Sequence, residues 1–378
     1  MTLDDNRDSA ARRTFSATAR LLSALKLDGP LVVSLGLLCV YGLIVQYSAS
    51  GQSLDTIVRT TMRIGIGALA MIALAHSSPN FLRSLAPWLY GVGIALLVVV
   101  DAVGHVGKGA QRWLDLGLVR FQPSEIMKLA VPMMAAAFMH ERPLPPTWRN
   151  LLVLAAIVLV PSALVALQPD LGTAVLIFAT GALVVLMAGL QWRVIAGLAL
   201  AGGGAAVIGW RFLHDYQRQR IRVFLDPQSD PLGSGYHIIQ SQIAIGSGGL
   251  FGKGWMNGSQ AQLEFLPERS TDFIFAVIGE EFGLLGLLVL LLLYLFIVSR
   301  SLYLATQASG TFARLLASSL ALTFFVYVFI NAGMVTGLLP VVGVPLPLIS
   351  YGGTSVVTLL AGFGILMGLY SHRKLVNS

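Results

Sequence analysis

The residues of this chain that could do chemistry lie beside its long apolar segments. Asp272 ends a polar stretch and is followed at once by an almost wholly apolar run, Phe273 to Val298. Ionisable groups are costly at a membrane boundary unless they have partners or a function. A carboxylate at this position could act as a general base that takes a proton from an attacking hydroxyl. The structural alternative is that Asp272 only caps the helix that follows.

Two further charged pairs open apolar segments. Arg59 and Arg63 are four residues apart and so share one helix face, although Arg59 could also simply snorkel to the interface. Glu125 and Lys128 are three residues apart and can form an ion pair, which would be structural if it did nothing else. These pairs predict charge at membrane depth.

Other polar side chains fall on the same side of the chain's apolar segments. Gln168 and Asp170 flank Pro169 in a predicted tight turn, where Asp170 could shape a cavity or only cap the next helix. Glu280 and Glu281 lie in the first third of the run that follows Asp272, and they could instead pair with arginines of a neighbouring helix. Separate structural accidents would scatter over both leaflets, so this concentration predicts a polar cavity open to the outside.

Arginines suggest what such a cavity binds. Arg218, Arg220 and Arg222 occupy alternate positions just beyond the seventh apolar segment, on the predicted outer side. Guanidinium groups bind phosphate oxygens through forked hydrogen bonds. A solvated surface patch is the alternative, but basic residues are not favoured on the outer side of a membrane. The arginines therefore favour an anionic headgroup such as a lipid-linked phosphate.

The composition identifies the elements that must position these residues. Charged residues make up 11% of the 378-residue chain, against roughly 25% in soluble domains, and apolar residues make up 56%. The mean hydropathy of +0.77 agrees with an integral membrane protein. The net charge of +7 is dispersed among the apolar segments, which favours an anionic membrane surface over nucleic acid as its partner. The single cysteine, Cys39, can form no intrachain disulfide.

Hydropathy predicts an all-α membrane protein. A bilayer core needs about 20 apolar residues per helix, and ten segments qualify, near 31–47, 57–75, 82–101, 124–139, 150–167, 172–188, 192–212, 273–298, 312–337 and 350–370. The sequence thus predicts about ten transmembrane helices in one membrane domain, residues 31–378, with a large extracytoplasmic loop at about 213–272 between helices 7 and 8. Lysine and arginine counts in the short loops place both termini in the cytoplasm, including an N-terminal tail, residues 1–30.

Several other motifs are rejected. Residues 247–254 look like a phosphate-binding loop but have the wrong residues at both ends of the motif, so we interpret them as a glycine turn after a short amphipathic helix around Ile238–Ile245. The six histidines show no metal-ligand spacing, and together with the single cysteine this argues against a zinc site. The N-terminal basic and apolar stretch resembles a secretory signal, but a retained first helix is simpler.

One stretch carries a specific resemblance. From Asn331 to Thr354 the chain has a helix end, a proline-broken connection, and a glycine-rich helix start. Non-helical backbone survives at membrane depth only where protein or a water-filled cavity covers it. The stretch resembles the signature of the shape, elongation, division and sporulation (SEDS) family. Its elongation branch, rather than its division branch, is matched by further segments: 111–115, 120–125, 216–220, 230–233, 235–241 and 263–275.

The resemblance implies a function. The SEDS family polymerises peptidoglycan glycan strands from lipid II, the undecaprenyl-pyrophosphate-linked disaccharide-pentapeptide, on the outer face of the cytoplasmic membrane. It works in cell elongation with a class B penicillin-binding protein, a transpeptidase that crosslinks the strands, within the elongation machinery. Its required carboxylate falls on Asp272. An α-linked donor that gives a β-1,4 product implies a single inverting displacement.

These considerations give an assignment for each residue. Asp272 is the expected base for the 4-hydroxyl of the acceptor, and Glu125 is expected to orient Lys128. Gln168 and Asp170 are expected to shape the cavity. The pyrophosphate, which gains negative charge as it departs, is expected to contact Arg59, Lys128, Arg218 and Arg220. A divalent cation, Mg²⁺ or Mn²⁺, could bridge the pyrophosphate, although no ligand cluster in the sequence demonstrates it. A lipid II flippase and a membrane scaffold for a transpeptidase remain as alternatives.

Overall fold

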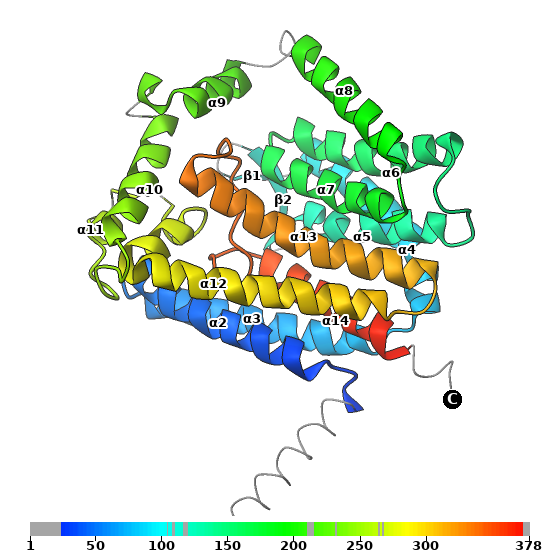
Figure 1. The fold of residues 1–378 in the computed structure, drawn as a ribbon, viewed down its shortest axis with the longest axis horizontal. Coiled ribbons are helices and arrows are strands. Elements are labelled where there is room, and N and C mark those ends of the chain that lie inside the picture. The colour runs from blue at the N-terminus through cyan, green and yellow to red at the C-terminus, as the bar shows by residue number, and fades with distance from the viewer. Residues whose placement is uncertain are drawn as a thin grey trace, which may run out of the picture.

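The structure is a computed structural model that describes residues 24–103, 105–107, 110–115, 120–209, 215–230, 233–263, 265–266 and 268–372. The predicted N-terminal tail up to residue 23 and the basic residues after His372 lie outside this description. The all-α class is confirmed, because helices make up nearly all of the regular structure (Figure 1). The described helices are α2 (Gly29–Ala49), α3 (Leu54–Ala75), α4 (Pro79–Val103), α5 (Pro123–Met139), α6 (Trp148–Leu167), α7 (Leu171–Met187), α8 (Trp192–Gly209), α9 (Asp215–Leu225), α10 (Ser234–Gly248), α11 (Ser259–Gln262), α12 (Ile274–Thr306), α13 (Thr311–Thr336) and α14 (Ser355–Ser371).

The predicted apolar segments all fall on helices. Within the described residues, six helices are long and apolar enough to cross a membrane, namely α2, α3, α4, α6, α12 and α13, and α7 and α14 are shorter apolar helices. Their boundaries differ from the predicted ones by a few residues. The largest shifts are at the start of α14, which begins at Ser355 rather than at 350, and at the end of α12, which continues to Thr306.

A small sheet interrupts the helical pattern. Strands β1 (His105–Gly107), β2 (Ala110–Asp115) and β3 (Arg120–Phe121) pair antiparallel in that order between α4 and α5. His105 pairs with Trp113, and Leu114 pairs with Phe121. The sequence analysis assigned no structure to this connection, because its strands are too short to show a reliable alternation.

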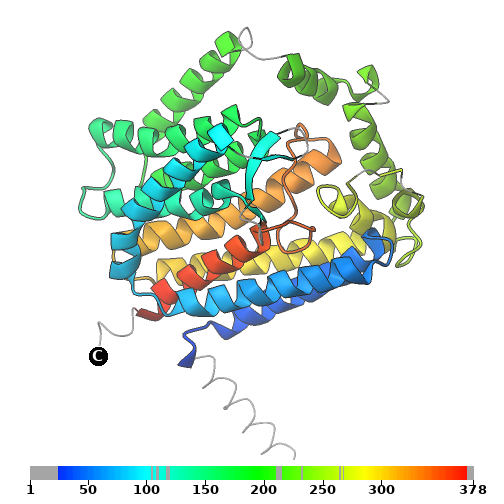
Figure 2. The same cartoon turned by 180° about the vertical axis from the view of Figure 1, so that it is seen from behind.

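Helix α13 lies at the centre of the bundle. It packs against α5, α7, α12 and α14, while α14 packs along α3 and α4 along α5 (Figures 1 and 2). Phe324 of α13 contacts the rings of Tyr294 and Phe363, with ring centroids 5.6 and 5.0 Å apart. Because its neighbours surround it, α13 can carry residues that link separate parts of the molecule.

The predicted large loop contains helices of its own. Beyond the expected amphipathic helix, which is α10 and is longer than predicted, it holds α9, the 3₁₀ turn η1 (Pro227–Ser229) and α11. Helix α10 runs across the direction of α12 and α13 in Figure 1. Ser241 donates a hydrogen bond of 2.7 Å to the Val335 carbonyl, and Gln242 donates one of 3.1 Å to the Thr336 carbonyl. These bonds satisfy carbonyls at the end of α13 that would otherwise lack partners.

Helix α12 is broken near its start. Gly283 has a φ of +65°, so residues 274–282 and 284–306 form two helical parts across a kink. The glycine turn after α10 fills the break with four backbone hydrogen bonds. The N–H groups of Leu284 and Leu285 donate to the carbonyls of residues 249 and 250, at 3.0 and 3.1 Å. In the other direction, residues 253 and 254 donate to the carbonyls of Glu280 and Glu281, at 2.9 and 3.0 Å.

Buried carboxylates hold the same turn in place. Glu280 is fully buried and accepts hydrogen bonds from Lys253 Nζ at 2.7 Å and from the N–H groups of Gln260 and Ala261 at 3.0 and 3.2 Å. Glu281 accepts a hydrogen bond from Ser48 of α2. The alternative, that these glutamates pair with arginines of a neighbouring helix, is not what the structure shows. Their burial is compensated by a lysine, by backbone N–H groups and by a serine, which anchor the loop to α12 and α2.

Candidate active site

Three successive carbonyl groups fix the backbone at Asp272. The Ser270 carbonyl accepts a hydrogen bond of 2.8 Å from the Tyr351 N–H, and the Thr271 carbonyl accepts one of 2.5 Å from Ser350 Oγ. The Asp272 carbonyl accepts one of 2.8 Å from Asn331 Nδ2. All three donors belong to the signature stretch 331–354, so this stretch holds the main chain that carries the carboxylate.

Asp272 does not cap α12. The N-cap residue of that helix is Phe273, and no side chain makes the capping hydrogen bond. The structural alternative for Asp272 is therefore wrong. Its carboxylate lies against the signature stretch instead, because a Cβ atom added to Gly343 would stand 3.3 Å from Asp272 Oδ2. Gly343 also has a φ of +73°, so a side chain at 343 would both strain the backbone and crowd the carboxylate.

The irregular part of the signature stretch is held by side chains from three helices. Asn331 Nδ2 donates to the Val344 carbonyl at 2.8 Å, and Tyr294 of α12 donates to the Pro347 carbonyl at 2.7 Å. Gln46 of α2 donates to the Ile349 carbonyl at 2.6 Å. Non-helical backbone inside a membrane protein needs such partners, since no lipid can supply them. The stretch is therefore a rigid support for Asp272.

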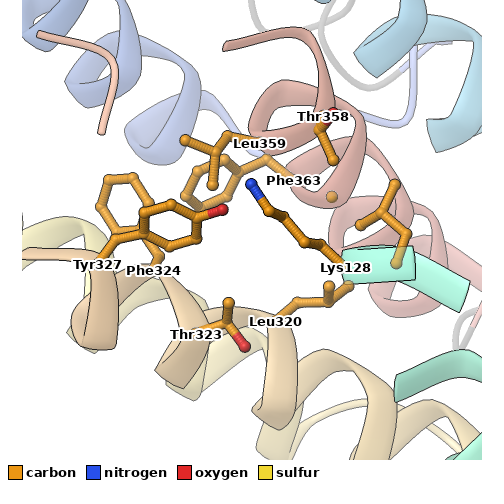
Figure 3. Close-up of a pocket in the computed structure, with 10 residues that line it drawn as sticks. Lys128, Leu320, Thr323, Phe324, Tyr327, Thr358, Leu359 and Phe363 are labelled. Carbon is orange, nitrogen blue, oxygen red and sulfur yellow. The ribbon is translucent and has the colours of Figure 1, made fainter. Parts of the chain in front are cut away.

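The Glu125–Lys128 pair lies in the same half of the bundle. Lys128 Nζ is 2.7 Å from Glu125 Oε1, and both side chains are more than nine-tenths buried. Lys128 Nζ also lies 5.4 Å from the centroid of the Tyr327 ring, and Figure 3 shows the ammonium group pointing toward the Tyr327 hydroxyl. The predicted ion pair is confirmed, with an aromatic neighbour that the sequence did not indicate.

A small pocket adjoins this pair between α5, α13 and α14. Its volume is about 30 Å³, which is room for one or two water molecules. Apart from Lys128 and Tyr327 its lining is mostly apolar, with Leu320, Phe324 and Phe363 among the residues drawn in Figure 3. The ammonium group is thus enclosed in low-dielectric surroundings, where its attraction for an anion is strengthened.

Gln168 and Asp170 lie in the turn before α7, as predicted. Asp170 is the N-cap of α7 and accepts a hydrogen bond of 3.2 Å from the Thr173 N–H, so its capping role is confirmed. Its other oxygen accepts one of 3.2 Å from Gln122 at the start of α5. Gln168 is buried and donates to the Leu97 carbonyl of α4 at 2.9 Å. Both residues therefore tie helix ends together.

Helix α13 connects the two groups of residues. Tyr327, which faces Lys128, and Asn331, which holds the Asp272 carbonyl, are four residues apart and so lie about 6 Å apart along one face of the helix. Val344 of the signature stretch belongs to the same apolar cluster as Tyr327 and Leu176 of α7. The side chains that contact Lys128 and the Asp272 main chain are thus about one turn apart on α13.

Two predicted arginines lie in the first half of α3. Arg59 forms an ion pair of 2.8 Å with Asp55, one turn earlier, and its side chain is 61% exposed. The pairing of Arg59 with Asp55 was not predicted from the sequence. Arg63 lies over the ring of Tyr351, 4.7 Å from its centroid, and Tyr351 is the residue whose N–H holds the Ser270 carbonyl. Arg63 therefore directly contacts a residue that supports the main chain at Asp272.

The loop arginines lie elsewhere. Arg218 and Arg220 belong to α9, which packs against η1 and α10 and stands outside the bundle in Figures 1 and 2. Helical geometry overrides the expected alternation, since Arg218 and Arg222 share a face only because they are four residues apart. The side chain of Arg220 lies outside the description. Helix α9, which carries these arginines, lies outside the helical bundle in both views (Figures 1 and 2).

Several side chains near Asp272 were not predicted to be there from the sequence. Asn331 and Ser350 were part of the signature, but nothing in the pattern showed that they bind the carbonyls around Asp272. His237 of α10 stacks on Phe273, with ring centroids 5.7 Å apart. Burial lowers the pKa of His237, and the nearby Glu268 carboxylate opposes this shift. His237 precedes Asp272 by more than thirty residues, so only the fold shows that it lies beside this turn.

The described residues offer a base and a cation, but no preformed metal centre. Within the described ranges, no group of three or more His, Cys, Asp or Glu side chains is placed to hold a metal ion. Asp272 can accept a proton, and Lys128 can stabilise a developing anion, each held by neighbours that fix its position. Such an arrangement suits a reaction in which a group is transferred to a hydroxyl and an anionic leaving group departs.

The chain belongs to the family of FtsW, RodA and SpoVE, since the model of this family, described as a cell cycle protein, matches residues 28–375. This is the SEDS family that the sequence resembled. The chain is therefore a multi-pass membrane protein of this family.

Two curated relatives are similar to the chain over most of its length. The chain is 53% identical over 352 residues to the peptidoglycan glycosyltransferase MrdB of Escherichia coli strain K12, covering 93% of this chain and 95% of that one. It is 40% identical to the MrdB of Helicobacter pylori strain 26695, covering 77% of each chain.

Solved structures agree in fold. A chain from a structure described as the coordination of polymerization and crosslinking by a peptidoglycan synthase complex superposes with a TM-score of 0.80 at 35% identity, covering 92% of this chain and 98% of that one. The rod shape determining protein RodA of Thermus thermophilus superposes with a TM-score of 0.70 at 31% identity, covering 92% and 97%.

Proposed function

We propose that the protein is a peptidoglycan glycosyltransferase that polymerises lipid II during cell elongation, with Asp272 as general base. The observation that carries the proposal is the placement of Asp272: it does not cap α12, and the signature stretch holds three carbonyl groups around it. The relatives are named peptidoglycan glycosyltransferases, which supports glycosyl transfer as the class of reaction.

The chemistry follows from the groups at hand. Asp272 takes the proton of the acceptor 4-hydroxyl as that oxygen attacks the anomeric carbon of the donor. The bond from this carbon to the pyrophosphate oxygen breaks in the same step, so the configuration inverts and no covalent enzyme intermediate forms. Lys128, oriented by Glu125, stabilises the departing pyrophosphate. Arg59, Arg218 and Arg220 remain predicted contacts, and the first of these must leave Asp55 to reach the substrate.

Other participants are proposed on the same basis. A divalent cation, Mg²⁺ or Mn²⁺, would be carried chiefly by pyrophosphate oxygens, which fits the lack of a three-residue ligand group in the described ranges. A class B penicillin-binding protein is the proposed partner, supported by the likeness to a chain of a peptidoglycan synthase complex. The proposed location is the bacterial cytoplasmic membrane, with both termini in the cytoplasm and Asp272 at the outer face.

The test is polymer synthesis from lipid II by the purified full chain in proteoliposomes, followed on gels, with moenomycin present to silence contaminating polymerases. We expect Asp272→Ala to lower the rate by about 10²–10⁴-fold, the usual contribution of a general base. The matched control is Asp226→Ala, which removes an exposed carboxylate that only caps η1 and should leave the rate unchanged.

The outcome separates the alternatives. Polymer made by Asp272→Ala at the wild-type rate would contradict the assignment of the base. A flippase would move lipid II across the bilayer without making polymer, and Asp272→Ala would retain that movement. A scaffold would support growth of cells that carry Asp272→Ala at normal expression.

A further inference from the structure

We propose that residues 249–256, here called the interfacial loop, insert into the outer leaflet of the bilayer and help to anchor the protein there. The loop exposes large apolar side chains: Leu250 is 61% exposed, Phe251 78% and Trp255 44%. An exposed cluster of this size on a loop is unfavourable in water, so it marks a surface that something apolar covers. The inference concerns membrane anchoring and does not depend on the proposed reaction.

The backbone of the loop is suited to a water-poor environment. Its carbonyls at residues 249 and 250 and its N–H groups at residues 253 and 254 pair with the two sides of the break in α12. Backbone at membrane depth must be satisfied by protein, because lipid cannot donate or accept in its place. The loop therefore continues into the apolar region without leaving these groups unpaired.

The charge of the loop is neutralised as well. Lys253 is its only charged residue in the sequence. Its Nζ lies 2.7 Å from the buried carboxylate of Glu280 and 2.8 Å from Ser259 Oγ. An unpaired ammonium would oppose insertion, whereas a paired one directed toward α12 does not. The loop thus presents apolar side chains outward and its charge inward.

The contacts of the loop with α2 show how far it lies from the end of that helix. Trp255 donates its indole N–H to the carbonyl of Ile44 at 3.2 Å, and its ring lies 6.0 Å from that of Tyr47. Ile44 is five residues before the end of α2 at Ala49, so the indole lies about 7.5 Å inside that end. Interfacial segments bury their apolar face about 5–10 Å into the headgroup and acyl boundary. The position of Trp255 agrees with such a segment.

The occupant is lipid because the surface is continuous with helix faces that face lipid. Leu284 and Leu285 of α12, whose N–H groups bind the loop, are 46% and 49% exposed, and Ile44 of α2 is 42% exposed. Between the loop, α10 and α12 lies an apolar groove of about 350 Å³, lined by Ile245, Leu250, Leu284 and Leu287 together with two glycines. A groove of this chemistry beside a lipid-facing helix fits an acyl chain.

The experiment places a fluorophore on the loop of the full chain. Phe251→Cys is labelled with an environment-sensitive nitrobenzoxadiazole group and reconstituted into phosphatidylglycerol–phosphatidylethanolamine vesicles that hold lipids spin-labelled near the headgroup. Cys39 is buried, so labelling of the wild type gives the background. The matched control is Gln228→Cys in η1, an exposed polar position. Leu250→Cys probes the same surface if Phe251→Cys fails to fold.

We expect the label at 251 to be quenched by the spin-labelled lipid at least two-fold more than the label at 228, and to resist aqueous iodide. Quenching by iodide without quenching by lipid would overturn the proposal, because the loop would then be solvated. Protection from both quenchers would overturn it too, because a protein surface would then cover the loop.

Discussion

The Glu125–Lys128 pair is buried deeply enough for substitution to separate its structural role from its chemical one. Removing one partner of a buried ion pair leaves an uncompensated charge, whereas replacing both can be nearly neutral. Lys128 has a second contact, the Tyr327 ring, that gives it a defined direction beside the pocket. Stability and activity therefore need not change together at this site.

We expect Lys128→Met alone to destabilise the protein by about 3–5 kcal/mol, seen as a lower melting temperature in detergent. The double variant Glu125→Gln/Lys128→Met should melt close to the wild type. If Lys128 stabilises the pyrophosphate, the stable double variant will still polymerise lipid II far more slowly. Recovery of both stability and activity in the double variant would show that the pair is only structural.

The sequence was sufficient to select Asp272 but not to describe its environment. A carboxylate at the start of an apolar run is a local pattern, and so is an i,i+3 ion pair. The three carbonyl hydrogen bonds join residues about 60 to 80 positions apart, and no local pattern encodes them. The Asp55–Arg59 pair is a local i,i+4 pattern that the sequence could have shown. The contact of Arg63 with Tyr351 joins distant parts of the chain and appears only in three dimensions.

Among the helices, the feature that hydropathy failed to predict is the break in α12 at Gly283. The run after Asp272 was predicted as one continuous helix because every residue near Gly283 except two glutamates suits a membrane span. The four backbone bonds that fill the break come from residues 249–254, some thirty positions earlier. The glutamates that looked like candidates for the cavity instead anchor this loop.

Gly283→Ala tests the break. A Cβ atom at 283 would stand 2.3 Å from the N atom of Gly252, and the φ of +65° disfavours any L side chain. The strain of about 1–2 kcal/mol and the loss of hydrogen bonds worth about 1 kcal/mol each predict a melting temperature several degrees lower. The matched control is Gly36→Ala in α2, where nothing lies within 4 Å of the added Cβ. Equal melting temperatures for the two variants would contradict the described break.

At the scale of the whole molecule, the arrangement of charges predicts the orientation in the membrane. Asp272 precedes α12, Glu125 and Lys128 lie in the first turn and a half of α5, Asp170 caps the start of α7, and the interfacial loop contacts the end of α2 and the break in α12. The opposite ends carry Arg300, which binds the Asp28 carboxylate through two hydrogen bonds of 3.0 and 2.7 Å. Because basic residues favour the cytoplasmic side, we expect the candidate site to face outward.

Cysteine labelling checks this orientation. We expect a membrane-impermeant maleimide to label Gln228→Cys in intact spheroplasts and Thr147→Cys only after permeabilisation, because these exposed positions lie in η1 and in the α5–α6 connection. Labelling of Thr147→Cys without permeabilisation would reverse the proposed topology. Wild-type protein, with its buried Cys39, provides the background.

The three hydrogen bonds that hold residues 270–272 also have a consequence for biogenesis. Asp272 leaves the ribosome long before Asn331, Ser350 and Tyr351, which are contributed by the last two helices and their connection. Until those residues are in place, the turn that bears the carboxylate lacks these three hydrogen bonds. We therefore expect a chain truncated before Asn331 to make no glycan.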